Sequence, residues 1–218
     1  MTLDDLTRMK EHRAEDRTAL DELLDEVLVG TLATVTTDGR PWAVPMLFAR
    51  DGDRLLLHGS TGAGALRQVA AGAEAVLEVH VVDGLVLATS MFEHSANYRS
   101  AVVRGQLQRL TGDAAVEALD VISDGLIPGR RAEVRGMLGK EVAATVALAL
   151  GITDDNWILK VNSGDTEEEL YEESVWTGVL PMHTAYGEPE RSPWLEDDVP
   201  VPPSVTALLE HQEPGQRG

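Results

Sequence analysis

The residues best suited to chemistry lie in one short stretch rich in glycine and hydroxyl groups, HGSTGAGALR (residues 58–67). Ser60 and Thr61 offer hydroxyls, and glycines such as Gly62 let backbone amides approach a ligand closely. Arg67 is the only basic side chain that can serve as a cation here, and it follows the predicted start of a helix, whose N-terminus favours an anion. This combination predicts a loop that binds one phosphate group. The alternative is an ordinary glycine-rich turn capped by Ser60.

Other enzyme chemistries find little support in the 218 residues. Cysteine is absent, which excludes disulfides, thiolate metal sites and cysteine nucleophiles. No GxSxG, P-loop or HExxH pattern occurs, and Gly62–Gly64 lacks the third glycine of a Rossmann fingerprint. The formal net charge of −19 argues against nucleic acid as a partner, although a local basic pocket can still hold a small phosphate.

Tight turns divide the part of the chain that carries this loop into short strands. Alternating Thr- and Val-rich patterns, with turns at Asp38-Gly39 and Asp51-Gly52-Asp53, predict strands at 30–37, 41–50 and 54–58. Further strands are expected at 74–82 and 85–92, around a turn at Asp83-Gly84, and at 98–110, 146–152 and 176–185. Helical spacing predicts helices at 15–28, 65–71, 113–127, 131–146 and 205–211. Because no helices separate the first three strands, an antiparallel barrel with helical decoration is favoured over a doubly wound sheet.

Three segments resemble the pyridoxamine 5′-phosphate oxidase-like family: GTLATVTTDGRPWAVPMLFARDGDRLLLHGSTGAGALRQV (30–69), MFEHSANYRSAVVRGQ (91–106) and VWTGVLP (175–181). The most similar branch contains nitroimidazole-resistance proteins and flavin-binding proteins, and the similarity covers residues 15–185. The resemblance implies a mainly β fold with helices, a six-stranded antiparallel split β-barrel, and a homodimer with FMN at the subunit interface. Some relatives of this fold carry haem b instead. Residues 1–186 would form the barrel domain with its N-terminal helix, and 187–218 a Pro-rich acidic tail.

The candidate cofactor contacts are Ala43, Val44, Pro45, His58, Ser60, Thr61, Gly62, Arg67, Tyr98 and Arg99. The resemblance sets the backbone of the strand around Pro45 against the flavin ring, and the loop that precedes Arg67 against the flavin phosphate. Because proline has no N–H, Pro45 also predicts a bulge or an exposed edge in that strand. Tyr98 or Arg99 could hydrogen-bond the flavin or the substrate, and Arg99 could equally pair with an acid across the subunit interface.

Two of the six histidines are candidate catalytic residues. His58 ends a predicted strand beside the phosphate loop and matches a common histidine of the family. It would face the flavin or the substrate, bind haem iron as an axial ligand, or serve only as a hydrogen-bonded residue at a strand end. His94 is the second candidate for both roles, but Glu93 replaces the first of two adjacent histidines that relatives often have. His80 alternates with valines and is expected to be structural.

Three functions remain open. The first is an FMN-dependent oxidoreductase or reductase of a small organic substrate. The second is a haem enzyme on the same barrel with His58 or His94 on the iron, and the third is a non-catalytic flavin-binding protein. The charged N-terminus and the lack of an apolar run of about 20 residues predict a cytoplasmic protein without a membrane partner.

Overall fold

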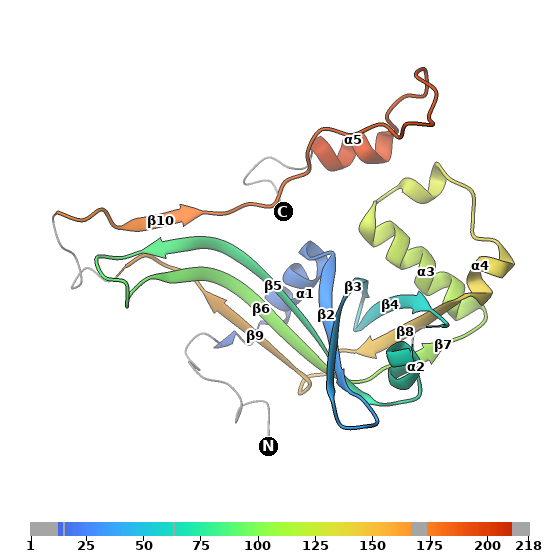
Figure 1. The fold of residues 1–218 in the computed structure, drawn as a ribbon, viewed down its shortest axis with the longest axis horizontal. Coiled ribbons are helices and arrows are strands. Elements are labelled where there is room, and N and C mark those ends of the chain that lie inside the picture. Colours follow the sequence, from blue (N-terminus) through green and yellow to red (C-terminus); the bar gives the residue numbers. More distant parts are fainter. Residues whose placement is uncertain (1–12, 15, 63, 167–173, 211–218) are drawn as a thin grey trace.

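An antiparallel sheet organises the molecule (Figure 1). The structure, a computed structural model, describes residues 13–14, 16–62, 64–166 and 174–210. The strands are β1 (Arg13–Ala14), β2 (Val29–Val35), β3 (Pro41–Asp51), β4 (Arg54–Ser60), β5 (Glu74–Leu87), β6 (Ser95–Gln106), β7 (Gln108–Leu110), β8 (Thr145–Gly151), β9 (Trp157–Asn162) and β10 (Gly178–Pro181). The helices are α1 (Arg17–Glu26), α2 (Gly64–Ala70), α3 (Asp113–Leu126), the 3-10 helix η3 (Arg130–Ala132), α4 (Gly139–Ala143) and α5 (Pro203–Glu210). The strand order is β1-β9-β6-β5-β2-β3-β4-β8-β7, and β10 pairs with β5.

The first three predicted strands form the meander that the sequence indicates. Gly39 in the β2–β3 turn has φ +80°, and Gly52 in the β3–β4 turn has φ +59°. Both values lie in the left-handed region that glycine adopts without strain. The sheet then curls into a split barrel with helical decoration, which confirms the mainly β split-barrel prediction.

The predicted turn at Asp83-Gly84 is wrong. The chain continues as the single strand β5, with a bulge between Val82 and Gly84, and turns back only after Leu87. Gly84 is needed for another reason, since a Cβ there would lie 3.0 Å from the carbonyl oxygen of Leu180 in β10. A glycine inside a strand can mark a bulge and the close approach of another backbone as well as a turn.

In the second half of the chain one further prediction is wrong and one strand was missed. The helix expected at 131–146 is replaced by the three residues of η3 and the five of α4, and Gly136, a poor helix former, lies in the non-helical stretch between them. Strand β9 was not predicted, and it pairs with β6 over six residues.

The barrel is split where β3 changes partners. Its first half, Pro41–Leu47, pairs with β2, whereas Phe48–Asp51 pairs with β4. The larger core lies inside the curled sheet and receives Leu20, Leu23 and Leu24 from α1. A second, smaller core lies on the outer face, where α3 covers the middle of β3, β4 and β8.

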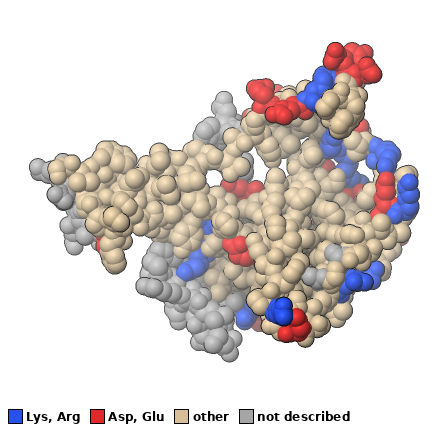
Figure 2. Space-filling model, in the orientation of Figure 1, with Lys and Arg blue, Asp and Glu red and all other residues tan. Residues whose placement is uncertain are grey.

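Strands β5 and β6 extend beyond the barrel as an arm, and β10 lies along the outer part of β5 (Figure 1). After β10 the chain crosses above the sheet to α5. Here the amide and hydroxyl of Ser204 donate to the Glu133 carboxylate at 3.0 and 2.6 Å, which ties α5 to the end of η3. Figure 2 shows openings between this C-terminal tail (residues 182–210) and the body of the molecule.

Candidate cofactor site

The predicted phosphate loop leaves β4 at the split and leads directly into α2. A Cβ at Gly59 would lie only 2.2 Å from Cδ1 of Leu66, so the absence of a side chain lets α2 pack against the end of β4. The Ser60 hydroxyl accepts a hydrogen bond from the Gly62 amide at 3.2 Å, as expected for a capped turn. The amide of Thr61 donates to the Ala144 carbonyl at 3.1 Å. The loop is therefore held from both sides, and its glycines leave backbone exposed.

A cavity of about 350 Å³ lies beside this loop. Thr61, Arg67 and Arg109 line it together with Ala70, Ala71 and Val146. Arg67 reaches back toward the start of its own helix, since a Cβ at Gly64 would lie 4.0 Å from its Nη2. Among the residues that the structure describes, neither Arg67 nor Arg109 forms an ion pair, whereas Arg54 and Arg99 do. Two free guanidinium groups and a threonine thus meet at one cavity, which suits an anion.

Arg109 was missed by the sequence analysis. It lies on β7, opposite Leu148 of β8, and β8 also pairs Val146 with Gly59 of the loop. Only the pairing of β7, β8 and β4 brings it near Arg67, and no local pattern in the sequence signals this.

The two segments expected to hold the flavin flank the split in the sheet. The pairing of β3 with β4 ends at Phe48 and Leu57, so Ala43–Pro45 lies in the part of β3 that has no β4 partner. Register with β2 is regular through Pro45, which therefore sits at an exposed edge and not at a bulge. The loop of residues 58–62 departs from the same point on the other side. The arrangement leaves the backbone of both segments available to a ligand.

His58 is the first residue of β4 beyond that last pair. It lies on the face of β4 that carries Leu56, which packs beneath α3. Its Nδ1 atom is buried and has no hydrogen-bond partner among the described residues. Burial lowers the pKa of His58 below the ordinary 6.5, so the imidazole is neutral at pH 7. A buried ring nitrogen without a partner is rare in folded proteins, and a bound ligand can satisfy it.

The other predicted residues lie away from the split. His94 lies in the connection between β5 and β6, where its Nδ1 accepts a hydrogen bond from the Ala88 amide at 3.0 Å. Tyr98 lies half-buried on β6, opposite Val82. The structure does not bring His94 near His58 within one chain, and their joint role in catalysis stays a prediction.

Arg99 is held by two carboxylates of its own chain. Its guanidinium donates to both oxygens of Asp83, at 3.0 and 2.7 Å, and to both oxygens of Glu26, at 2.6 and 3.3 Å. The hydrogen bonds that Arg99 donates to Asp83 and then to Glu26 raise the pKa of Arg99. Arg99 thereby ties the bulge of β5 to the last turn of α1. Its expected contact with the flavin, the substrate or an acid across the subunit interface stays a prediction.

A second cavity, of about 430 Å³, lies under the start of the C-terminal tail. Its walls come from residues 26–29, from His80–Val82 on β5, and from Met182 and residues 184–186 of the tail. The Nδ1 of His80 lies 2.9 Å from Oε1 of Glu78. The alternation of His80 with valines predicted a structural residue, but His80 lines a cavity and has a carboxylate partner.

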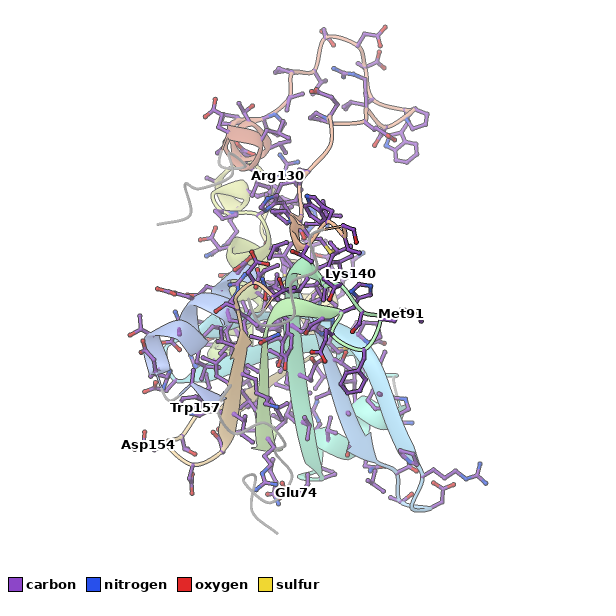
Figure 3. All side chains as sticks on the ribbon, turned by 90° about the vertical axis from the view of Figure 1, so that its left-hand side faces the viewer. Glu74, Met91, Arg130, Lys140, Asp154 and Trp157 are labelled. Atoms are coloured by element: carbon purple, nitrogen blue, oxygen red, sulfur yellow. The ribbon has the colours of Figure 1, made fainter. Side chains whose placement is uncertain are left out.

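A wider hollow, of about 700 Å³, lies at the opposite end of β5. It is lined by charged residues of both signs, Glu74, Arg104 and Asp155, together with residues 33–35 of β2. Figure 3 labels Glu74 and Asp154 at this end of the sheet, and Met91 at the end of the arm. None of the predicted site residues lines this hollow, so its size does not make it the better candidate.

Comparisons with known proteins agree with this architecture. The family described as pyridoxamine 5′-phosphate oxidase matches residues 16–156. The FAD and haem binding protein from Mycobacterium smegmatis is 44% identical, over 91% of this chain and 97% of that chain, with a TM-score of 0.88. The flavocytochrome Anf3 from Azotobacter vinelandii is 29% identical, over 93% and 94% of the two chains, with a TM-score of 0.84.

A third solved structure supports the fold alone. It is a protein assigned to 5-nitroimidazole antibiotic resistance from Bacteroides thetaiotaomicron, 19% identical over 68% of this chain and 86% of that chain, with a TM-score of 0.59. No curated protein sequence matches. Among the described helices, none is both long and apolar enough to cross a membrane. The matched span covers more than half of the sequence, and the chain therefore belongs to the pyridoxamine 5′-phosphate oxidase family.

Proposed function

We propose that this protein is a homodimeric flavin-dependent oxidoreductase of a small organic substrate, and that it binds haem as a second cofactor. One observation gives the main support for the proposal that the protein binds a flavin. Arg67 and Arg109 converge with Thr61 on one cavity, and neither guanidinium pairs with a described carboxylate. In a chain with 37 acidic and 18 basic side chains, two free guanidinium groups at one cavity indicate a ligand anion such as a flavin phosphate.

The split next to this cavity supports a place for the flavin ring. The free edge of β3 at Ala43–Pro45 offers backbone groups, and the buried Nδ1 of His58 has no described partner. A neutral imidazole can donate or accept a hydrogen bond at a flavin nitrogen or oxygen, which fits the group. In this proposal His58 orients the ring or exchanges a proton with the substrate, and Thr61, Arg67 and Arg109 anchor the phosphate.

The flavin is proposed to be FAD, although the sequence analysis expected FMN. The support is the 44% identity to a protein from Mycobacterium smegmatis that binds FAD and haem. That relative also supports both cofactors in one chain, where the sequence analysis treated them as alternatives. A flavin exchanges one or two electrons and haem iron one, so the role of the protein is to bind and orient both groups.

The dimer is proposed from exposed apolar side chains on one face of the sheet. Val29, Val35 and Leu47 are 48%, 58% and 41% exposed, and Val29 lies opposite Leu47 in the β2–β3 pair. Apolar clusters of this kind on a sheet face commonly mark protein interfaces. Light scattering at micromolar concentration is expected to give twice the mass of one chain, and a monomer would contradict this part of the proposal.

The cofactor proposal is tested on the purified protein and on three arginine variants. The absorption spectrum is expected to show two flavin bands and a Soret band, and mass spectrometry of the released flavin distinguishes FAD from FMN. Arg67→Ala and Arg109→Ala each remove charge-assisted hydrogen bonds worth about 1.5–3 kcal/mol, so the flavin dissociation constant should rise roughly 10- to 100-fold.

Arg40→Ala is the matched control, because Arg40 is 83% exposed in the β2–β3 turn and pairs only with Asp38 among the described residues. It should leave the flavin affinity unchanged. Equal flavin affinity in all three variants would show that the cavity is not the phosphate site. Turnover with a reductant and candidate substrates separates an enzyme from a protein that only stores flavin.

A further inference from the structure

The second cavity occupies a gap along one edge of β5. Strand β2 pairs with Ala75–Glu78 on this edge, and β10 pairs with Gly84–Leu87. Between them, the Met182 amide donates to the Asp83 carbonyl at 2.9 Å and fixes the start of the tail above the gap. No strand among the described residues fills this gap, and the resulting cavity is lined mostly by apolar side chains from three separate segments of the chain.

His80 enters this cavity with its ring oriented by a carboxylate. Its Nδ1 lies 2.9 Å from Oε1 of Glu78. An ionised carboxylate only accepts hydrogen bonds, so Nδ1 must carry a proton. In the neutral ring the lone pair is then on Nε2, the outer nitrogen. Histidines that bind metals in proteins usually donate their other N–H to a carboxylate or carbonyl in this way.

The other described histidines lack this arrangement. His58 has a buried Nδ1 with no described partner, so nothing holds its tautomer. His94 uses the lone pair of Nδ1 to accept the Ala88 amide, which leaves the proton on Nε2. His183 lies exposed in the tail and lines none of the three cavities described above. Of the four, His80 alone combines a cavity, a supporting carboxylate and an available nitrogen.

We propose that His80 binds the iron of a haem that lies in and over the cavity under the tail, with Met182, which lines the same cavity, as the candidate second ligand. A thioether and an imidazole are an established pair of ligands for haem iron. Val27, Leu28 and Val82 provide apolar walls for the porphyrin. The inference rests on the proposed function for the presence of haem, and it replaces His58 and His94, the ligands expected from the sequence.

The test is a titration of purified flavoprotein with haemin, followed by the Soret band, with flavin content measured in the same samples. His80→Ala should lose the Soret shift while retaining flavin, and added imidazole should restore the band. Glu78→Gln should still bind haemin, with affinity lowered roughly 10- to 100-fold, as is typical when a supporting partner of a metal ligand is removed. Met182→Leu should retain the haem and change the iron from low spin to high spin in electron paramagnetic resonance.

His94→Ala is the matched control and should bind haemin as the wild type does. His58→Ala removes the other ligand expected from the sequence and should keep the Soret shift whatever its flavin content. Because His80 is a surface residue whose side chain is 62% exposed, its replacement should leave the fold intact, which circular dichroism checks. An unchanged haemin spectrum in His80→Ala, or its loss in His58→Ala, would overturn the proposal. A wild-type protein that binds flavin but no haemin would also overturn it, and would leave the flavin part of the proposed function standing.

Discussion

Replacing Arg99 by alanine should destabilise the fold without weakening flavin binding. The side chains of Arg99, Asp83 and Glu26 are 29%, 38% and 28% exposed, so the two ion pairs are neither fully buried nor free in solvent. A hydrogen bond to a charged group contributes about 1.5–3 kcal/mol when buried, and an exposed pair about 0–1. About 1 kcal/mol per carboxylate is therefore reasonable, which gives about 2 kcal/mol for Arg99→Ala.

Urea denaturation at pH 7 measures the loss of unfolding free energy in Arg99→Ala. For a chain of this size it corresponds to a decrease in melting temperature of roughly 4–8 °C. Arg99→Lys keeps the charge but not the planar fork that engages both acids, so it should recover about half of the loss or less. Arg40→Ala, in an exposed pair, should change stability by less than about 0.5 kcal/mol. If Arg99→Ala were as stable as Arg40→Ala, or if it released flavin while stable, then the structural role of Arg99 would be refuted.

Two further predictions concern the loop and the tail. Gly59→Ala should force Leu66 and α2 away from β4. The unfolding free energy should fall by about 1–3 kcal/mol, and flavin binding should weaken. An unchanged unfolding free energy and an unchanged flavin affinity would show that α2 is not held by this contact. Hydrogen bonds from Ser204 lower the pKa of Glu133 below 4.5. The contact between Glu133 and Ser204, which holds α5, should therefore be fully present above pH 4.5. It should be lost as the pH falls through the lowered pKa of Glu133. Amide protection factors of residues 203–210 should follow this change, Ser204→Ala should lower them at neutral pH, and protection independent of both would contradict the assignment.

The sequence predicted well those features that depend on local chemistry. Gly39 and Gly52 mark the turns of the meander because positive φ is required at those positions, and the chain around them supplies no competing signal. The loop before Arg67 was found for the same reason, since its hydroxyls, glycines and cation follow one another along the chain. The split-barrel fold follows from these turns together with the family resemblance.

The features that the sequence did not reveal depend on contacts between distant segments. Gly84 carries a hairpin signal in its own neighbourhood, but the approach of β10 explains it better. Arg109 joins Arg67 only through strand pairing, and Glu78 supports His80 only because the two side chains share one face of β5. Each residue pattern is locally ambiguous, and tertiary structure decides between its meanings.

The ribosome makes the two sides of the cavity under the tail in a fixed order, because synthesis runs from the N-terminus to the C-terminus. The floor of the cavity is complete once His80–Val82 has been made, whereas its roof requires Met182 and the residues that follow. At roughly 5–20 residues per second, ribosomes add the intervening segment over several seconds. Strands β6, β8 and β9 are made within that interval, so in its last part the sheet is complete while the cavity is still open on the side of the tail. A large planar ligand can enter from that side before the C-terminal segment covers it. Once the tail is docked through Ser204 and Glu133 it covers one side of the same ligand, so detachment of this final segment should speed release of the ligand.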